Sequence, residues 1–123
     1  MKWLFLFTLT MLGHSLSFAE GFASSTIGFE IMRSQQLGNC VACHDIPGVQ
    51  GRVSTLGPSL QGVARKWSRT ELTQWVKDAR KINPQTLMPP FGVIEGLTKA
   101  IPPRAILSDA QILQVVDTLQ SWQ

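Results

Sequence analysis

The alternation of apolar and polar residues predicts two helices in the C-terminal half of the chain. The first covers residues 68–83, begins with a capping box of Ser68 and Glu71, and is ended by Asn83-Pro84. The second covers residues 108–122 and begins with a capping box of Ser108 and Gln111. Apolar residues recur at helical spacing in both segments: Leu72, Trp75, Val76 and Ala79, then Ile112, Val115, Val116, Leu119 and Trp122. Each helix is expected to pack one face on a core.

A shorter helix is expected over about residues 27–37, where Gly28 would allow another helix to approach closely. Loops rich in Gly and Pro separate these segments, and there is little alternation of β-branched residues. The chain is 44% hydrophobic and 15% charged, which argues against disorder. The sequence therefore predicts one all-α domain of three to four helices.

The first 19 residues are typical of a cleaved secretory signal. A lysine precedes a mostly apolar run from Trp3 to Leu12, and small residues at Ser17 and Ala19 fit a cut after Ala19. The alternative is an uncleaved membrane anchor, which needs about 20 apolar residues, roughly twice the length of this run. We expect a signal peptide at residues 1–19 and an exported, periplasmic domain at residues 20–123.

Removal of the signal leaves Cys40, Cys43 and His44 as the remaining cysteines and histidine. A structural disulfide would close too small a loop to stabilise the fold much and would leave His44 unexplained. Zinc needs a further pair of ligands. A thioredoxin-like dithiol should follow a β-strand, which the preceding residues do not resemble. The spacing Cys-x-x-Cys-His is typical of covalent attachment of a c-type haem, with His44 as the proximal iron ligand.

Two methionines of the exported domain are candidates for the sixth iron ligand. Met88 lies between Asn83-Pro84 and Pro89-Pro90, which keep the segment out of a helix, and it is the favoured candidate. Met32 lies on the predicted first helix, where a methionine usually packs in the core. A vacant sixth position would instead indicate a gas-binding haem sensor. A ligating histidine normally donates its second ring N–H, and the Pro58 carbonyl is the candidate acceptor.

The whole predicted domain resembles the class I cytochromes c. The resemblance rests on a first helix with Gly28, the haem motif, "LGPSL" at residues 56–60, a methionine followed by proline, and the C-terminal helix. It implies His44 and Met88 as axial ligands, Pro58 as the partner of His44, and a first helix packed across the last. Gly28 precedes Cys40 by more residues than in typical short members, so the register of that packing is open.

A narrower resemblance is to the SoxX family, the monohaem cytochrome subunits of the periplasmic sulfur-oxidation system. It rests on "DARKINPQTLMPPFG" at residues 78–92, "PGVQG" at residues 47–51 and the long apolar loop at residues 94–107. It implies a heterodimer with a SoxA-like haem subunit, at which thiosulfate is joined oxidatively to a cysteine of the carrier SoxY. Electrons would pass through this chain to a soluble cytochrome c. The loop at residues 94–107 is a candidate partner surface.

Charge and residue chemistry limit the other functions. Loss of Lys2 with the signal leaves ten basic against eight acidic residues, too small an excess to identify a partner, and no nucleic-acid site is predicted. Both thiols would be consumed as thioethers, and the remaining histidine would bind iron, so no nucleophile and base pair of the usual kind remains. We expect an electron-transfer subunit with no catalytic residue of its own. A freestanding electron shuttle is the alternative.

Overall fold

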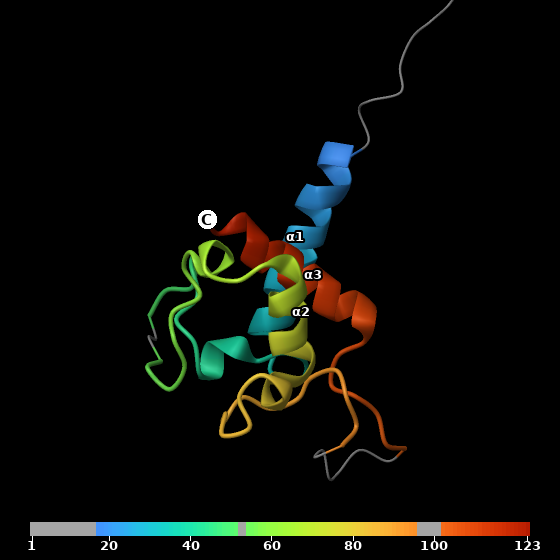
Figure 1. The fold of residues 1–123 in the computed structure, drawn as a ribbon. Coiled ribbons are helices and arrows are strands. Elements are labelled where there is room, and N and C mark those ends of the chain that lie inside the picture. The colour runs from blue at the N-terminus through green and yellow to red at the C-terminus, as the bar shows by residue number, and fades with distance from the viewer. Residues whose placement is uncertain (1–16, 52–53, 96–101) are drawn as a thin grey trace, which may run out of the picture.

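The computed structural model describes residues 17–51, 54–95 and 102–123 (Figure 1). The described residues form three α-helices: α1 (Ser17–Arg33), α2 (Arg69–Asp78) and α3 (Asp109–Ser121). Three short 3-10 helices, η1 (Cys40–Ala42), η2 (Val63–Arg65) and η3 (Ala79–Lys81), lie in or beside the connections. The described ranges contain no β-strand. The predicted all-α class is confirmed.

Both predicted capping boxes are present. The Ser68 hydroxyl accepts a hydrogen bond from the Glu71 amide, and the Glu71 carboxylate accepts one from the Ser68 amide. Ser108 and Gln111 make the same reciprocal pair at the start of α3. These side chains satisfy amide groups that have no partner within the first turn of a helix, so both starts agree with the sequence prediction to within one residue.

The helix α2 ends earlier than the apolar pattern predicts. Asp78 leaves the helical conformation with φ −158° and ψ 89°, and its carboxylate accepts a hydrogen bond from the backbone amide of Arg80. The Arg80 guanidinium also donates to this buried carboxylate, with Nε 2.7 Å from Oδ1. This local pairing competes with the α-helical backbone, so the chain continues as η3.

The helix α1 starts earlier and ends earlier than the predicted helix at residues 27–37. It ends at Arg33, and Gly38 then donates its N–H to the carbonyl of Ile31 at 3.1 Å, which folds residues 34–38 back as turns. The predicted apolar run of the signal lies outside the described residues, and the predicted cut after Ala19 falls in the first turn of α1. No helix in the described part of the chain is long and apolar enough to span a membrane.

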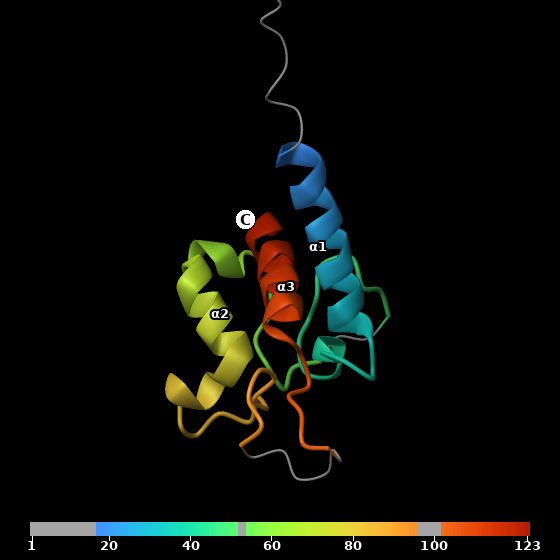
Figure 2. The same ribbon diagram turned by 90° about the vertical axis from the view of Figure 1, so that its right-hand side faces the viewer.

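The first helix packs across the last, as the resemblance implied. A Cβ atom at Gly28 would overlap the carbonyl of Gln114 and the hydroxyl of Thr118, so only glycine permits this approach. The Thr118 hydroxyl donates to the carbonyl of Ser25 at 2.6 Å and ties the two helices together. Figures 1 and 2 show α1 crossing α3 while α2 lies along its other side. The unusual spacing between Gly28 and the cysteines therefore leaves this packing intact.

Two ion pairs connect α2 to α3. Arg69 pairs with Asp117, and Nζ of Lys77 lies 2.7 Å from a carboxylate oxygen of Asp109. The apolar faces of these helices meet α1 in one core, which consists of Ile31, Met32, Ile46, Leu72, Val76, Phe91, Leu107, Ile112, Val115, Val116 and Leu119. The two long connections, between α1 and α2 and between α2 and α3, extend from this core and carry the predicted haem-binding residues.

Candidate functional site

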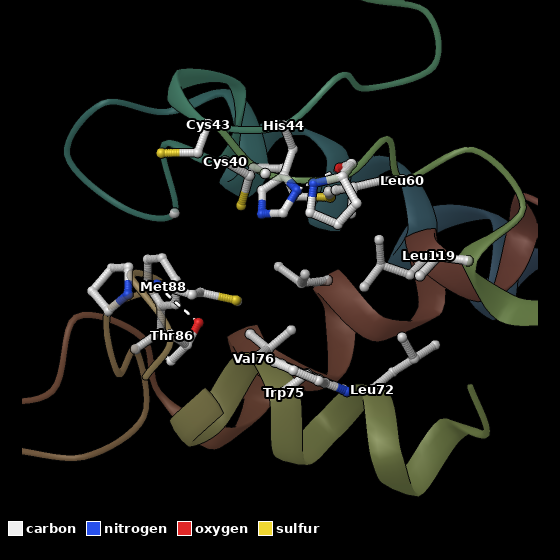
Figure 3. Close-up of a pocket in the computed structure, with 18 of the residues that line it drawn as sticks. Cys40, Cys43, His44, Leu60, Leu72, Trp75, Val76, Thr86, Met88 and Leu119 are labelled. Carbon is white, nitrogen blue, oxygen red and sulfur yellow. Dashed lines mark hydrogen bonds between the residues drawn. The ribbon is translucent and has the colours of Figure 1, made fainter. Parts of the chain in front are cut away.

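A cavity of about 740 Å³ opens between the helical core and the two long connections. Its size falls within the roughly 300–1,000 Å³ that cofactor and small-molecule sites occupy. Apolar side chains of α2 and α3, including Val76 and Leu119, form one wall (Figure 3). Cys40, Cys43, His44, Pro58 and Met88 all line it, so the fold gathers every predicted site residue around one space.

The two cysteines come from the short turn at η1. Asn39 adopts a left-handed conformation with φ 45°, which asparagine tolerates better than most residues, and Cys40 follows it directly. The amide of His44 donates to the Cys40 carbonyl at 2.9 Å, which closes the turn. Both thiols are free. Burial raises the pKa of the Cys40 thiol to about 11.

The imidazole of His44 is held by the loop that contains Pro58. Its Nδ1 lies 2.7 Å from the carbonyl oxygen of Pro58, and because a carbonyl can only accept, Nδ1 carries the proton. This leaves Nε2 as the nitrogen with a free lone pair for a metal. The amide of Gly57 donates to the Cys43 carbonyl at 2.7 Å, which brings the loop before Pro58 against the ring.

Met88 reaches the cavity from the other long connection. In Figure 3 the thioether of Met88 and the imidazole of His44 enter the cavity from opposite sides. Met32 also lines the cavity, but it lies on α1, is only 1% exposed and belongs to the helical core. The Cα atom of Met32 would lie 3.4 Å from a Cβ atom at Gly38, so this methionine is beside the cysteine-bearing turn.

One buried polar atom supports a cofactor with hydrogen-bond acceptors. Nε1 of Trp75, on α2, is buried and has no partner among the described residues. A buried indole N–H usually donates a hydrogen bond, and Trp75 lines the cavity. Lys66 lines the same cavity and places its ammonium 5.4 Å from the ring centre of Trp67. The cavity thus offers apolar walls, two thiols, an imidazole, a thioether and donors for carboxylates. These residue types fit a haem.

Sequence reasoning placed Trp75 only on an apolar helix face and did not identify it as a site residue. Gly57 was also missed, although a Cβ there would lie 2.6 Å from Cε1 of His44. Leu56 and Leu87 line the cavity and are 66% and 82% exposed, so they form part of its rim. Gly57 could have been predicted as a site residue, because it directly precedes the predicted Pro58. The rim residues Leu56 and Leu87 could not be predicted, because they come from two loops that are distant in sequence and meet only in the fold.

The cytochrome c family model matches residues 27–123. Among solved structures, the crystal structure of SoxXA from P. pantotrophus contains a chain with 32% sequence identity and a TM-score of 0.72; the match covers 80% of each chain. No curated protein gives a significant sequence match. Cytochromes c carry a covalent haem c, and Cys40 and Cys43 fit the attachment motif for one haem. The chain belongs to the cytochrome c family, and its predicted resemblance to the SoxX cytochromes is confirmed.

Proposed function

We propose that this cytochrome is the electron-accepting subunit of a periplasmic thiosulfate-oxidising complex. It accepts electrons from a SoxA-like haem partner while thiosulfate is coupled to a cysteine of a SoxY-type carrier, and it passes them to a soluble cytochrome c. The observation that carries this proposal is the 32% identity to a chain of SoxXA over 80% of both chains. Export through cleavage of residues 1–19 would place the domain in the same compartment as these partners.

The residues of the cavity have distinct roles in this proposal. Cys40 and Cys43 would hold the haem through thioethers, and His44 and Met88 would bind its iron. When bound, the haem supplies a one-electron redox centre. The Pro58 carbonyl fixes the tautomer and orientation of His44 through the bond at Nδ1. The apolar wall that includes Val76 and Leu119 excludes water, which limits reorganisation around the iron when its charge changes.

The proposed role is electron acceptance, and sulfur chemistry is assigned to the partner. Joining thiosulfate to a thiol through a sulfur–sulfur bond releases two electrons and one proton. A chain with one haem holds one electron at a time, so each turnover needs either two successive transfers to this haem or a second redox centre on the partner. The thiols of Cys40 and Cys43 are committed to the haem and cannot carry a sulfur substrate. Thiosulfate therefore has no acceptor on this chain alone.

Reduction of the haem in defined mixtures tests this function. Thiosulfate added to the oxidised holoprotein alone should leave its absorbance unchanged. Addition of purified SoxA-like and SoxY-type proteins should then reduce the haem, and omission of the SoxY-type protein should prevent it. If thiosulfate reduces the isolated chain as fast as the mixture, or if no SoxA-like protein binds it, the subunit role is wrong and a freestanding electron shuttle is the better description.

The apolar loop at residues 94–107 was the partner surface expected from the sequence. Its residues 96–101 lie outside the described residues, and Ile94 beside them is exposed. Its last residue, Leu107, is buried and donates its amide to the Phe91 carbonyl at 2.8 Å. We retain the loop as a proposed contact with the SoxA-like partner, and a charged residue at Ile94 should weaken reduction in the mixture without changing the haem spectrum.

A further inference from the structure

The backbone around Met88 has few hydrogen-bond donors of its own. Pro89 and Pro90 follow Met88 directly, and neither has a backbone N–H. The Met88 amide is therefore the last donor before Phe91. This amide donates to the hydroxyl of Thr86 at 3.1 Å (Figure 3). The Thr86 hydroxyl thus accepts the hydrogen bond from the Met88 amide that a backbone carbonyl would accept in a helix or a strand.

Thr86 is itself connected by hydrogen bonds to η3, the short helix that follows α2. Its amide donates to the carbonyl of Asn83 at 3.1 Å, and the Asn83 amide donates to the carbonyl of Ala79 at 2.9 Å. The Asn83 side chain also accepts from the amide of Gln85 at 3.0 Å. Ala79 is completely buried in the core. A continuous series of hydrogen bonds therefore runs from the core to Met88, and the Thr86 hydroxyl is its last link.

The chain after Met88 is held by backbone groups. The Gly92 amide donates to the carbonyl of Lys77 at 2.9 Å, at the end of α2, and the Phe91 carbonyl accepts from the amide of Leu107. Phe91 is buried, so this end of the loop is anchored by packing as well. The two ends of the Met88 loop thus differ in what holds them. Among the described residues, the end before Met88 is the one that a side-chain hydroxyl holds through a hydrogen bond, which a single substitution can remove.

We propose that Thr86 is a positioning residue that keeps the Met88 thioether at the sixth iron position and closes that position to external ligands. The inference rests on the proposed role of Met88 as axial ligand. Without the hydroxyl, the Met88 amide loses its acceptor, and the segment from Thr86 to Met88 gains alternative conformations in which the thioether leaves the iron. With the hydroxyl, the sixth iron position stays occupied, as an electron carrier requires. Without it, that position opens to small molecules.

Binding of imidazole to the oxidised holoprotein measures how often the sixth position opens. We expect Thr86→Val, which keeps the shape but removes the acceptor, to raise the rate of imidazole binding about three- to tenfold, the equivalent of one hydrogen bond. The weak far-red sulfur-to-iron band should weaken in parallel. Thr86→Ser restores the hydroxyl and should restore both values. Thr73→Val is the matched control, because the hydroxyl of Thr73 donates its hydrogen bond within its own helix, to the carbonyl of Arg69.

The outcomes separate this inference from the assignment of Met88. If Met88→Ala opens the haem to imidazole but Thr86→Val binds it no faster than the unchanged protein, the positioning role of Thr86 is wrong. If Met88→Ala itself leaves the band and the rate unchanged, the ligand assignment fails and this inference fails with it. Should the valine variant not load haem, Thr86→Ala, which removes the hydroxyl without putting a methyl group in its place, decides by the same rate of imidazole binding.

Discussion

Gly57 and His44 are in direct contact: a Cβ atom at Gly57 would lie 2.7 Å from Nδ1 of the imidazole, the atom that bonds to Pro58. Gly57→Ala should therefore displace the ring and lengthen that bond, with a loss of about 1–3 kcal/mol in the free energy of unfolding. Chemical denaturation and the nuclear magnetic resonance signals of the His44 ring measure the two effects. Gly51→Ala is the control for the ring signals alone: its Cβ would meet nothing within 4 Å, but φ of +97° strains an alanine there, so any loss of stability in that variant comes from the backbone. If the His44 ring signals are the same in the Gly57 and Gly51 variants, the contact between Gly57 and His44 is contradicted.

Covalent attachment should make the haem resistant to extraction. Holoprotein matured in a periplasm with haem-attachment machinery should keep its colour on the polypeptide after acid and organic solvent, because thioethers at Cys40 and Cys43 do not dissociate. Replacing either cysteine by alanine should leave one thioether and shift the absorbance of the reduced haem. Haem that extracts freely from the unchanged protein would contradict the attachment.

Met88→Ala should abolish the far-red sulfur-to-iron band and lower the reduction potential, because a thioether favours ferrous iron. Absorbance spectroscopy and a redox titration measure these changes. Met32→Leu is the matched comparison: the side chain is buried in the core, and a volume-conserving change there should cost less than about 1.5 kcal/mol and leave the band intact. The reverse result would make Met32 the ligand and Met88 a packing residue.

Trp75→Phe tests whether a bound cofactor accepts a hydrogen bond from the Trp75 indole N–H. If a haem carboxylate accepts the indole N–H, removal of that donor should destabilise the holoprotein by about 1–3 kcal/mol. If the N–H has no acceptor, its removal should be neutral or stabilising, since a buried unsatisfied donor disappears. Trp67→Phe is the control, because Trp67 packs edge to face on Trp75 with ring centres 5.6 Å apart. The free energy of unfolding of the three proteins decides.

Asp78 should contribute to stability in a pH-dependent way. Hydrogen bonds from the Arg80 guanidinium hold the pKa of the Asp78 carboxyl below its ordinary value. Its contribution is therefore present above the ordinary carboxyl pKa and is lost as the pH falls through the lowered pKa of the folded state. Asp78→Asn should lower the melting temperature at neutral pH and reduce its further fall in acid. Asp109→Asn, which breaks an exposed pair with Lys77, should cost under about 1 kcal/mol.

The parts of the fold that local sequence determines were predictable. Ser68 with Glu71 and Ser108 with Gln111 mark the starts of α2 and α3, because a capping box is formed within four residues. The cysteine spacing predicted a haem, because two vinyl groups impose it chemically. The ends of the helices were less predictable. Asp78 ends α2 through a bond to its neighbour Arg80, which the apolar pattern does not register.

The arrangement of the cavity depended on contacts between distant segments. Trp75 looked like any apolar residue of a helix, and its unpaired N–H appears only when the space beside it is known. Gly28 was expected to permit a close helix, but the partner atoms on α3, the Gln114 carbonyl and the Thr118 hydroxyl, depend on the register of the crossing, which the sequence left open. Such details are set by tertiary packing, where each contact joins residues far apart in the chain.

The burial of Cys40 has a consequence for how the protein is made. A thiol whose pKa is about 11 is almost wholly protonated at neutral pH, whereas the thiolate is the reactive form of cysteine. Once the turn at η1 has folded against the core, this sulfur lines the cavity and is held in its less reactive form. Haem attachment at Cys40 is therefore expected to be faster in a chain that is still open than in one that has already folded.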